Sequence, residues 1–377
     1  MGNKTVPACT ETEGIDEAFA DILSANQAKA DALAELGIEE LRLGLYRVPI
    51  PLPNNPLKVL NSYFIVGKDK TTIIDVGFNH PDCEKALDKA LEALNTSWED
   101  VEIVLTHSHP DHTGNLDRVW RRWIRVYANM HSFQEVKNLM DIQSTVFNPL
   151  LRHLTDSSDY DERSMQKRNA NRYQVSAELL PLKNQPDLFY LSDGDTYKNG
   201  DYTFQVITTP GHDDWHICLY EPTKKILIAG DHVLERITPS VMSWVNSYDA
   251  LQEFINSLRK VRDLDVDLIL PGHGKPFTGV AERVDYLIQH HMDRLEELYS
   301  LVEQGHTSII DIARNASWRY PNWDEWTLDQ KFYSMGETFA HLIYLVNEGR
   351  ITLTITQNKR RFFIADQWDV KPVKQEE

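Results

Sequence analysis

Short apolar segments along the chain alternate with segments whose apolar residues recur at helical spacing. Apolar runs, which are typical of buried strands, lie at 41–50, 59–66, 71–76, 101–105, 124–128, 203–208, 217–220, 225–229 and 266–270. Helical patterns lie between them at 84–94, 114–123 and 248–261. This alternation predicts a mixed α/β protein in which two sheets pack together and helices cover their outer faces, an αββα sandwich.

The last part of the chain has a different pattern. Helices are predicted at 280–302, 308–315 and 328–347, and strands at 351–355 and 362–365. Helices followed by a hairpin predict a winged-helix-like module. Such a module suggests nucleic-acid binding, but the helix at 328–347 is not basic, and only Lys359, Arg360 and Arg361 at the hairpin tip are. An architectural or dimer-forming role is therefore favoured. His290 and His291 are adjacent on their helix and point apart, so we interpret them as packing or surface residues.

The chain is thus divided into an N-terminal helical extension (1–40), an α/β domain (41–275) and a C-terminal helical and winged-helix-like domain (276–377). The extension is rich in alanine and acids and is interpreted as a packing helix or a homodimerisation helix. A long insertion at about 131–182 is expected to act as a lid or binding loop. The insertion contains a run without acids that includes Arg163, Lys167, Arg168 and Arg172. These cations form either a solvated helix face or a clamp for an anionic substrate portion, such as the phosphates of coenzyme A or a nucleotide.

Composition narrows the function classes. The 377 residues include 57 acidic and 39 basic side chains, which gives a formal net charge of −18. A field of this sign repels phosphate backbones, so nucleic acid is an unlikely partner. The three cysteines, Cys9, Cys83 and Cys218, form no CxxC pair, which favours reduced thiols and a cytoplasmic location. No apolar signal region or membrane-spanning stretch is evident, so no membrane partner is expected.

The strand at 101–105 leads into a cluster of three histidines and an acid, His107, His109, Asp111 and His112. At these spacings the side chains could not converge from a helix or a regular strand, so they must lie on a loop at the end of the strand. That is where α/β folds place their chemistry. Neutral nitrogen donors combined with a hard oxygen donor suit zinc, and iron or manganese can also be held.

Later loops supply more candidate ligands, each directly after a predicted strand: His212, Asp231 and His273. The strand ends are therefore predicted to converge on one site. Because this set is too large for a single tetrahedral ion, it predicts two divalent metal ions about 3.5–4 Å apart.

These motifs, in this order, resemble those of the metallo-β-lactamase superfamily over roughly residues 41–275. The resemblance implies that one metal ion is held by His107, His109 and His212. It implies that the second is held by Asp111, His112 and His273, with Asp231 bridging the two ions. Asp75 matches an early acid that supports the metal loop rather than binding metal. Flavodiiron members carry Glu at the position of His109, which argues against oxygen reduction by a di-iron centre.

The segment 209–216, together with the C-terminal module, resembles the beta-lactamase-like protein 2 group, to which glyoxalase II is a more distant relative. His216 replaces a residue that is small in other branches. It is expected either to orient substrate or donate a proton, or else to pack and support the ligands. Asp111, Asp231 and His216 are accordingly the candidate catalytic residues.

The resemblance implies hydrolysis by a water molecule that the metal ions activate. Thiolates leave without a strong acid, and Asp231 and His216 are the only evident acids. We therefore expect hydrolysis of a thioester, ester or lactone in a small-molecule substrate, with or without the anionic coenzyme-like portion described above. The alternatives are a single-strand endoribonuclease and a mononuclear-iron persulfide dioxygenase.

Overall fold

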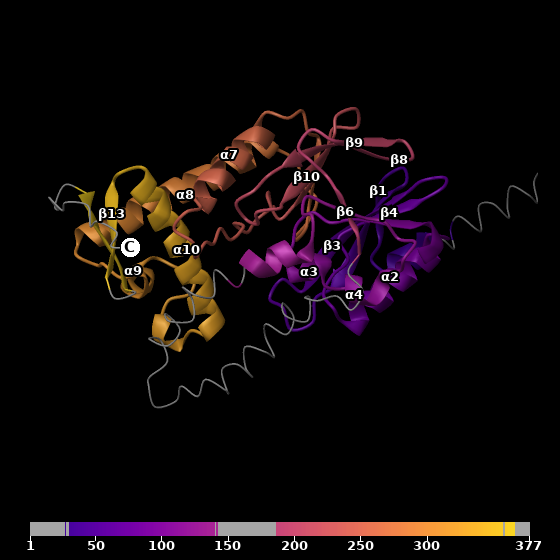
Figure 1. The fold of residues 1–377 in the computed structure, drawn as a ribbon. Coiled ribbons are helices and arrows are strands. Elements are labelled where there is room, and N and C mark those ends of the chain that lie inside the picture. Colours follow the sequence, from indigo (N-terminus) through magenta and orange to yellow (C-terminus); the bar gives the residue numbers. More distant parts are fainter. Residues whose placement is uncertain (1–26, 28–29, 140, 142–185, 357–358, 366–377) are drawn as a thin grey trace, which may run out of the picture.

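The computed structural model describes residues 27, 30–139, 141, 186–356 and 359–365. Two sheets form the centre of the α/β part of the chain (Figure 1). The seven-stranded sheet has its strands in sequence order: β1 (Glu39–Arg42), β2 (Leu45–Pro51), β3 (Val59–Val66), β4 (Thr71–Ile74), β5 (Val101–Val104), β6 (Val126–Ala128) and β7 (Leu188–Tyr190). The five-stranded sheet has the order β12 (Leu268–Pro271), β11 (Ile226–Gly230), β10 (Ile217–Glu221), β9 (Tyr202–Thr208) and β8 (Thr196–Asn199).

Alternating side chains on the strands build separate apolar layers. On β3, Tyr63 and Ile65 face the layer between the sheets, whereas Phe64 faces the opposite layer. That outer layer packs against α2 (Pro81–Ala93). On β10, Leu219 faces the layer between the sheets and Cys218 faces α7 (Ala250–Arg262). This period of two places the sheets face to face with helices outside, which confirms the predicted αββα sandwich.

The C-terminal region contains α8 (Val280–Glu303), α9 (Ile309–Asn315), the short 3₁₀ helix η2 (Trp323–Glu325), α10 (Leu328–Asn347) and the hairpin β13 (Ile351–Thr356) and β14 (Lys359–Ile364). Thr327 and Gln330 form a capping box that begins α10. Side chains of α8, α10 and β14 share one apolar cluster with α7 and β11. The region therefore packs against α7, on the outer side of the five-stranded sheet, and its winged-helix-like character stays a prediction.

Two local predictions were wrong. Helix was expected at 114–123, but the structure has the short helices α3 (Pro110–Thr113) and α4 (Leu116–Val119), and the chain is extended at Trp120. Pro110 favours a helix that begins at its own position, inside the metal motif. The short strands β7 and β8 were not predicted: β7 spans only three residues, too few to show a period, and β8 has a single apolar side chain, Tyr197.

Several sequence predictions fall mainly outside the described residues. These are most of the N-terminal helix, most of the insertion, and the cations Arg163, Lys167, Arg168 and Arg172. Cys83 and Cys218 are free and buried thiols, while Cys9 lies outside the described part. Within the described residues, every helix is too short or too polar to cross a bilayer. Of the adjacent histidines, His291 is buried against His341 of α10, with 3.1 Å between the ring nitrogens.

Candidate metal centre

The loop that follows β5 is fixed by the carboxylate of Asp75, at the end of β4. This carboxylate accepts hydrogen bonds from the Thr106 amide at 2.8 Å, the Thr106 hydroxyl at 2.7 Å and His112 Nδ1 at 2.7 Å. Asp75 itself has a φ of 62°, a conformation that costs about 1–3 kcal/mol for a residue other than glycine. The three hydrogen bonds offset this strain and set the start of the loop.

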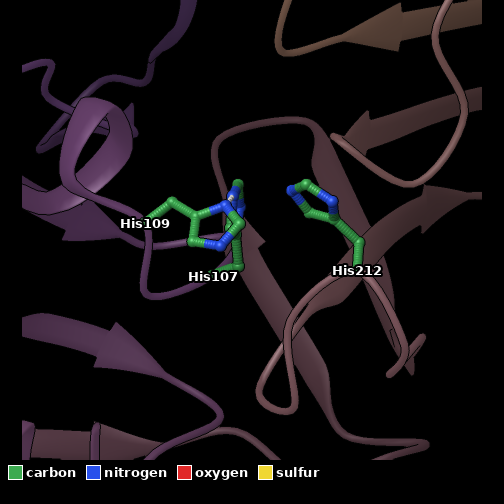
Figure 2. A group of neighbouring side chains, drawn as sticks. All are labelled: His107, His109 and His212. Carbon is green, nitrogen blue, oxygen red and sulfur yellow. Dashed lines mark hydrogen bonds between the residues drawn. The ribbon is translucent and has the colours of Figure 1, made fainter. Parts of the chain in front are cut away.

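His107, His109 and His212 form the first group of candidate ligands, whose ligand atoms all lie within 4.8 Å of one another. Figure 2 shows that the first two rings come from the loop after β5, and that the third approaches from the loop after β9. His107 Nε2 lies 3.1 Å from His109 Nδ1. These two nitrogens therefore point to the same place, which His212 Nε2 faces from the other side.

Asp111, His112 and His273 form the second group by the same distance criterion. His273 Nε2 lies 3.3 Å from Asp111 Oδ2. Asp231, directly after β11, lies between the two groups: its Oδ2 is 3.4 Å from His273 Nε2, 3.6 Å from His112 Nε2 and 3.8 Å from His212 Nε2. The structure thus brings all seven candidate ligands from four strand ends to one place, with Asp231 where a bridging carboxylate would stand.

The rings of His212 and His273 are each oriented by a hydrogen bond on the outer nitrogen. His212 Nδ1 donates to the Ser240 carbonyl at 2.7 Å, and His273 Nδ1 donates to the Val59 carbonyl at 2.9 Å. Because carbonyl oxygens only accept, these bonds fix Nδ1 as a protonated nitrogen and turn Nε2 toward the centre. Metal-binding histidines are typically held in this way.

Burial and neighbouring charges set the protonation of the centre. Burial lowers the pKa of His107 well below its ordinary value, and burial, together with His109, lowers the pKa of His212 to about 4. Both rings are therefore neutral ligands at pH 7.

The other group behaves differently because it is rich in carboxylates. Burial alone would lower the pKa of His273, but Asp231 and Asp111 outweigh it and raise that pKa to about 10. The pKa of His112 is also raised, since Asp75 and the other carboxylates outweigh its burial. These histidines hold protons that a metal ion would displace.

The buried polar atoms at the centre fit divalent metal ions. Within the described residues, four buried atoms that face the centre have no hydrogen-bond partner: His112 Nε2, His212 Nε2, His273 Nε2 and Asp231 Oδ1. Leaving such an atom unsatisfied costs about 1–3 kcal/mol. Metal coordination would satisfy all of them, and the mixture of imidazole and carboxylate donors suits zinc, iron or manganese.

The sequence left two roles open for His216, catalysis and support of the ligands, and its hydrogen bonds distinguish between them. Its Nε2 accepts a hydrogen bond from the Asp231 amide at 3.1 Å, so Nδ1 carries the proton and donates to Thr209 Oγ1 at 2.7 Å. The side chain is fully buried, and both nitrogens are engaged. Of the two sequence interpretations, this arrangement favours support of the ligand loops over proton donation.

Other supporting residues were not predicted. The Ser108 hydroxyl donates to Asp213 and links the loop after β5 to the loop after β9. The Asn61 amide donates to the carbonyls of Pro271 and Gly274 at 2.9 Å each. These bonds connect β3 to the loop of His273.

Comparison with known proteins identifies the family. A model of the metallo-beta-lactamase superfamily matches residues 57–273. "Probable metallo-hydrolase YqjP" of Bacillus subtilis is 28% identical to this chain, and the match covers 81% of this chain and 92% of that protein. A "Beta-lactamase-like protein 2 homolog" of Caenorhabditis elegans is 25% identical over 71% of this chain and 74% of its own. "Acyl-coenzyme A thioesterase MBLAC2" of Homo sapiens is 28% identical over 67% and 86%. The chain therefore belongs to the metallo-β-lactamase superfamily, and the prediction of a hydrolase of that family is confirmed.

Proposed function

We propose that this protein hydrolyses thioesters with two divalent metal ions, and that acyl-coenzyme A is the substrate class to test first. The observation that carries the proposal is the pair of adjacent ligand groups that share Asp231. His107, His109 and His212 would hold one ion, and Asp111, His112 and His273 the other. When bound, such ions supply an activated water nucleophile and stabilise negative charge on the substrate.

The protonation states of Asp111, Asp231 and His216 support a substrate whose leaving group departs without receiving a proton. The carboxylates of Asp111 and Asp231 are buried, which would raise their pKa values, but the neighbouring histidines outweigh this and lower both. His216 cannot donate toward the centre because both of its nitrogens are engaged. Thiols have a pKa near 8.5, so a thiolate departs without an acid, whereas an alkoxide does not. This difference favours thioesters over simple esters and lactones.

Similarity to the human acyl-coenzyme A thioesterase adds support for this substrate class. The phosphates of coenzyme A would need cations, and we propose Arg163, Lys167, Arg168 and Arg172 for that role on sequence grounds. These residues lie outside the described part of the chain. If they bind a remote phosphate, neutralising all of them should raise KM for an acyl-coenzyme A and spare a short uncharged thioester, because their binding energy would not come from the reacting centre.

The proposal is tested by metal analysis and a substrate panel. Protein purified without chelator should contain close to two transition-metal ions per chain and should cleave acyl-coenzyme A faster than an alkyl ester of the same acyl group, a lactone or single-stranded RNA. Asp231→Asn should lower kcat by orders of magnitude with an unchanged circular dichroism spectrum, because the ligand loops lie outside the core. The proposal fails if wild-type enzyme cleaves RNA and no thioester, or if it holds a single iron and consumes oxygen with persulfide. Those results would indicate the ribonuclease or the dioxygenase, respectively.

A further inference from the structure

The segment between β11 and α7, residues 231–249, carries Asp231 at its start and also orients a second ligand. The Ser240 carbonyl in this segment accepts the hydrogen bond that fixes the His212 ring. The position of the segment therefore decides where both side chains point. We call it the 231–249 loop.

Elements of the C-terminal region hold this loop at several points. On α10, the Gly336 carbonyl accepts a hydrogen bond from the Ser243 amide at 3.4 Å. On β14, Arg360 Nε donates to the side chain of Asn246 at 3.1 Å. Both contacts lie beyond Ser240, on the side of the loop that leads to α7.

Arg283, in the first turns of α8, holds the part of the loop that lies between the two ligand contacts. Its Nε donates to the Leu234 carbonyl at 2.6 Å and its Nη2 donates to the Ile237 carbonyl at 2.8 Å. The guanidinium also lies over the ring of Tyr286, with its carbon 4.9 Å from the ring centroid. Leu234 is three residues after Asp231, and Ile237 is three residues before Ser240.

We propose that Arg283 is a positioning residue for the metal centre, which acts through the 231–249 loop on Asp231 and on His212. A planar guanidinium can bond two carbonyls at a fixed separation, which a lysine ammonium cannot reproduce. The carbonyls carry no charge for Arg283 to neutralise, so its function here is geometric. The inference rests on the metal-ligand assignment of the proposed function, but not on the choice of substrate.

The experiment compares three variants of the full-length protein. Arg283→Met removes both hydrogen bonds, and Arg283→Lys keeps the charge but loses the two-carbonyl geometry. Arg350→Met is the matched control, because Arg350 also stacks on a tyrosine ring, Tyr299, at 4.4 Å, but its bonds go to Glu296. For each protein, zinc affinity is measured by competition with a chromogenic chelator, and the visible absorption spectrum is recorded after cobalt substitution.

Removal of residues that orient metal ligands typically lowers affinity by about 10- to 100-fold. We expect a loss in that range for Arg283→Met with a changed cobalt spectrum, a smaller loss for Arg283→Lys, and a change of less than about twofold for Arg350→Met. Should Arg283→Met not fold, Arg283→Lys decides the question by the same two measurements. Zinc affinity and a cobalt spectrum equal to those of the control would overturn the inference.

The substrate proposal fails separately from this inference. A wild-type protein that binds metal but cleaves no thioester would overturn only the substrate, and the Arg283 comparison would still stand. A wild-type protein that binds no metal would overturn both the ligand assignment and the positioning role.

Discussion

At the scale of single residues, the centre depends on close approaches that the ligand motifs alone do not reveal. Gly272 lies between β12 and His273, where its amide donates to the Gly230 carbonyl at 2.7 Å. A Cβ atom at Gly272 would overlap Asp231 Oδ1 and would lie 2.9 Å from His112 Cε1. Glycine is required there because the backbone passes against two candidate ligands.

We predict that Gly272→Ala displaces Asp231 and lowers kcat/KM by about 100-fold or more, since small displacements of reacting groups have effects of this size. Metal content should fall in parallel when measured by elemental analysis. Gly194→Ala is the control, because a Cβ there meets nothing within 4 Å while φ is +83°. This control should lower Tm by backbone strain and keep its metal. Equal activity in the two variants would contradict the role given to Gly272.

At the scale of secondary-structure elements, the sequence predicted that the candidate ligands converge, but it did not predict their protonation. The position of His107 and Asp231 directly after predicted strands was sufficient to predict that they lie close together, because strand ends meet at one sheet edge. It could not predict that His216 is locked, since its two partners, Thr209 and the Asp231 amide, are brought together only by tertiary folding. It also gave no sign that α10 buries a carboxyl group, Glu337, whose side chain is only 21% exposed.

Burial raises the pKa of Glu337 to about 7, although Arg294, with its Nε 4.0 Å away, lowers it. Between pH 4.5 and 7 the folded protein therefore keeps a proton that the unfolded chain loses, so stability falls as pH rises through this window. We predict that the Tm of Glu337→Gln, relative to wild type at equal metal concentration, increases from pH 4.5 to 7 and is constant above. Glu296→Gln on α8 should not show this increase, because a hydrogen bond from Arg350 lowers the pKa of Glu296. A pH-independent difference for Glu337→Gln would contradict the assignment.

At the scale of the whole molecule, the division of the chain at residue 275 does not coincide with a division of the core. Val284, Leu287 and Leu298 of α8 are fully buried in the cluster that also contains Phe254 of α7 and Ala229 of β11. Pattern analysis assigns helices and strands from local spacing, so it separated α8 from the sandwich at the metal motif of His273. Burial of one face against distant elements is not visible in such spacing. The shared core also explains how α8 can fix the 231–249 loop through Arg283.

We predict that a chain ending at residue 275 does not fold. Exposing one large buried apolar side chain costs about 1.5–3 kcal/mol, and domains have a free energy of unfolding of only about 5–15 kcal/mol. Exposure of the several α7 side chains that pack on the C-terminal region therefore costs more than the remaining chain has in stability. The truncated chain should lack a near-ultraviolet circular dichroism signal and bind a hydrophobic dye. A chain ending at Ala365 keeps every described element and should melt cooperatively, like wild type. If the chain ending at 275 also melts cooperatively and holds metal as tightly as wild type, the C-terminal region is a separate domain, and the metal centre does not depend on it.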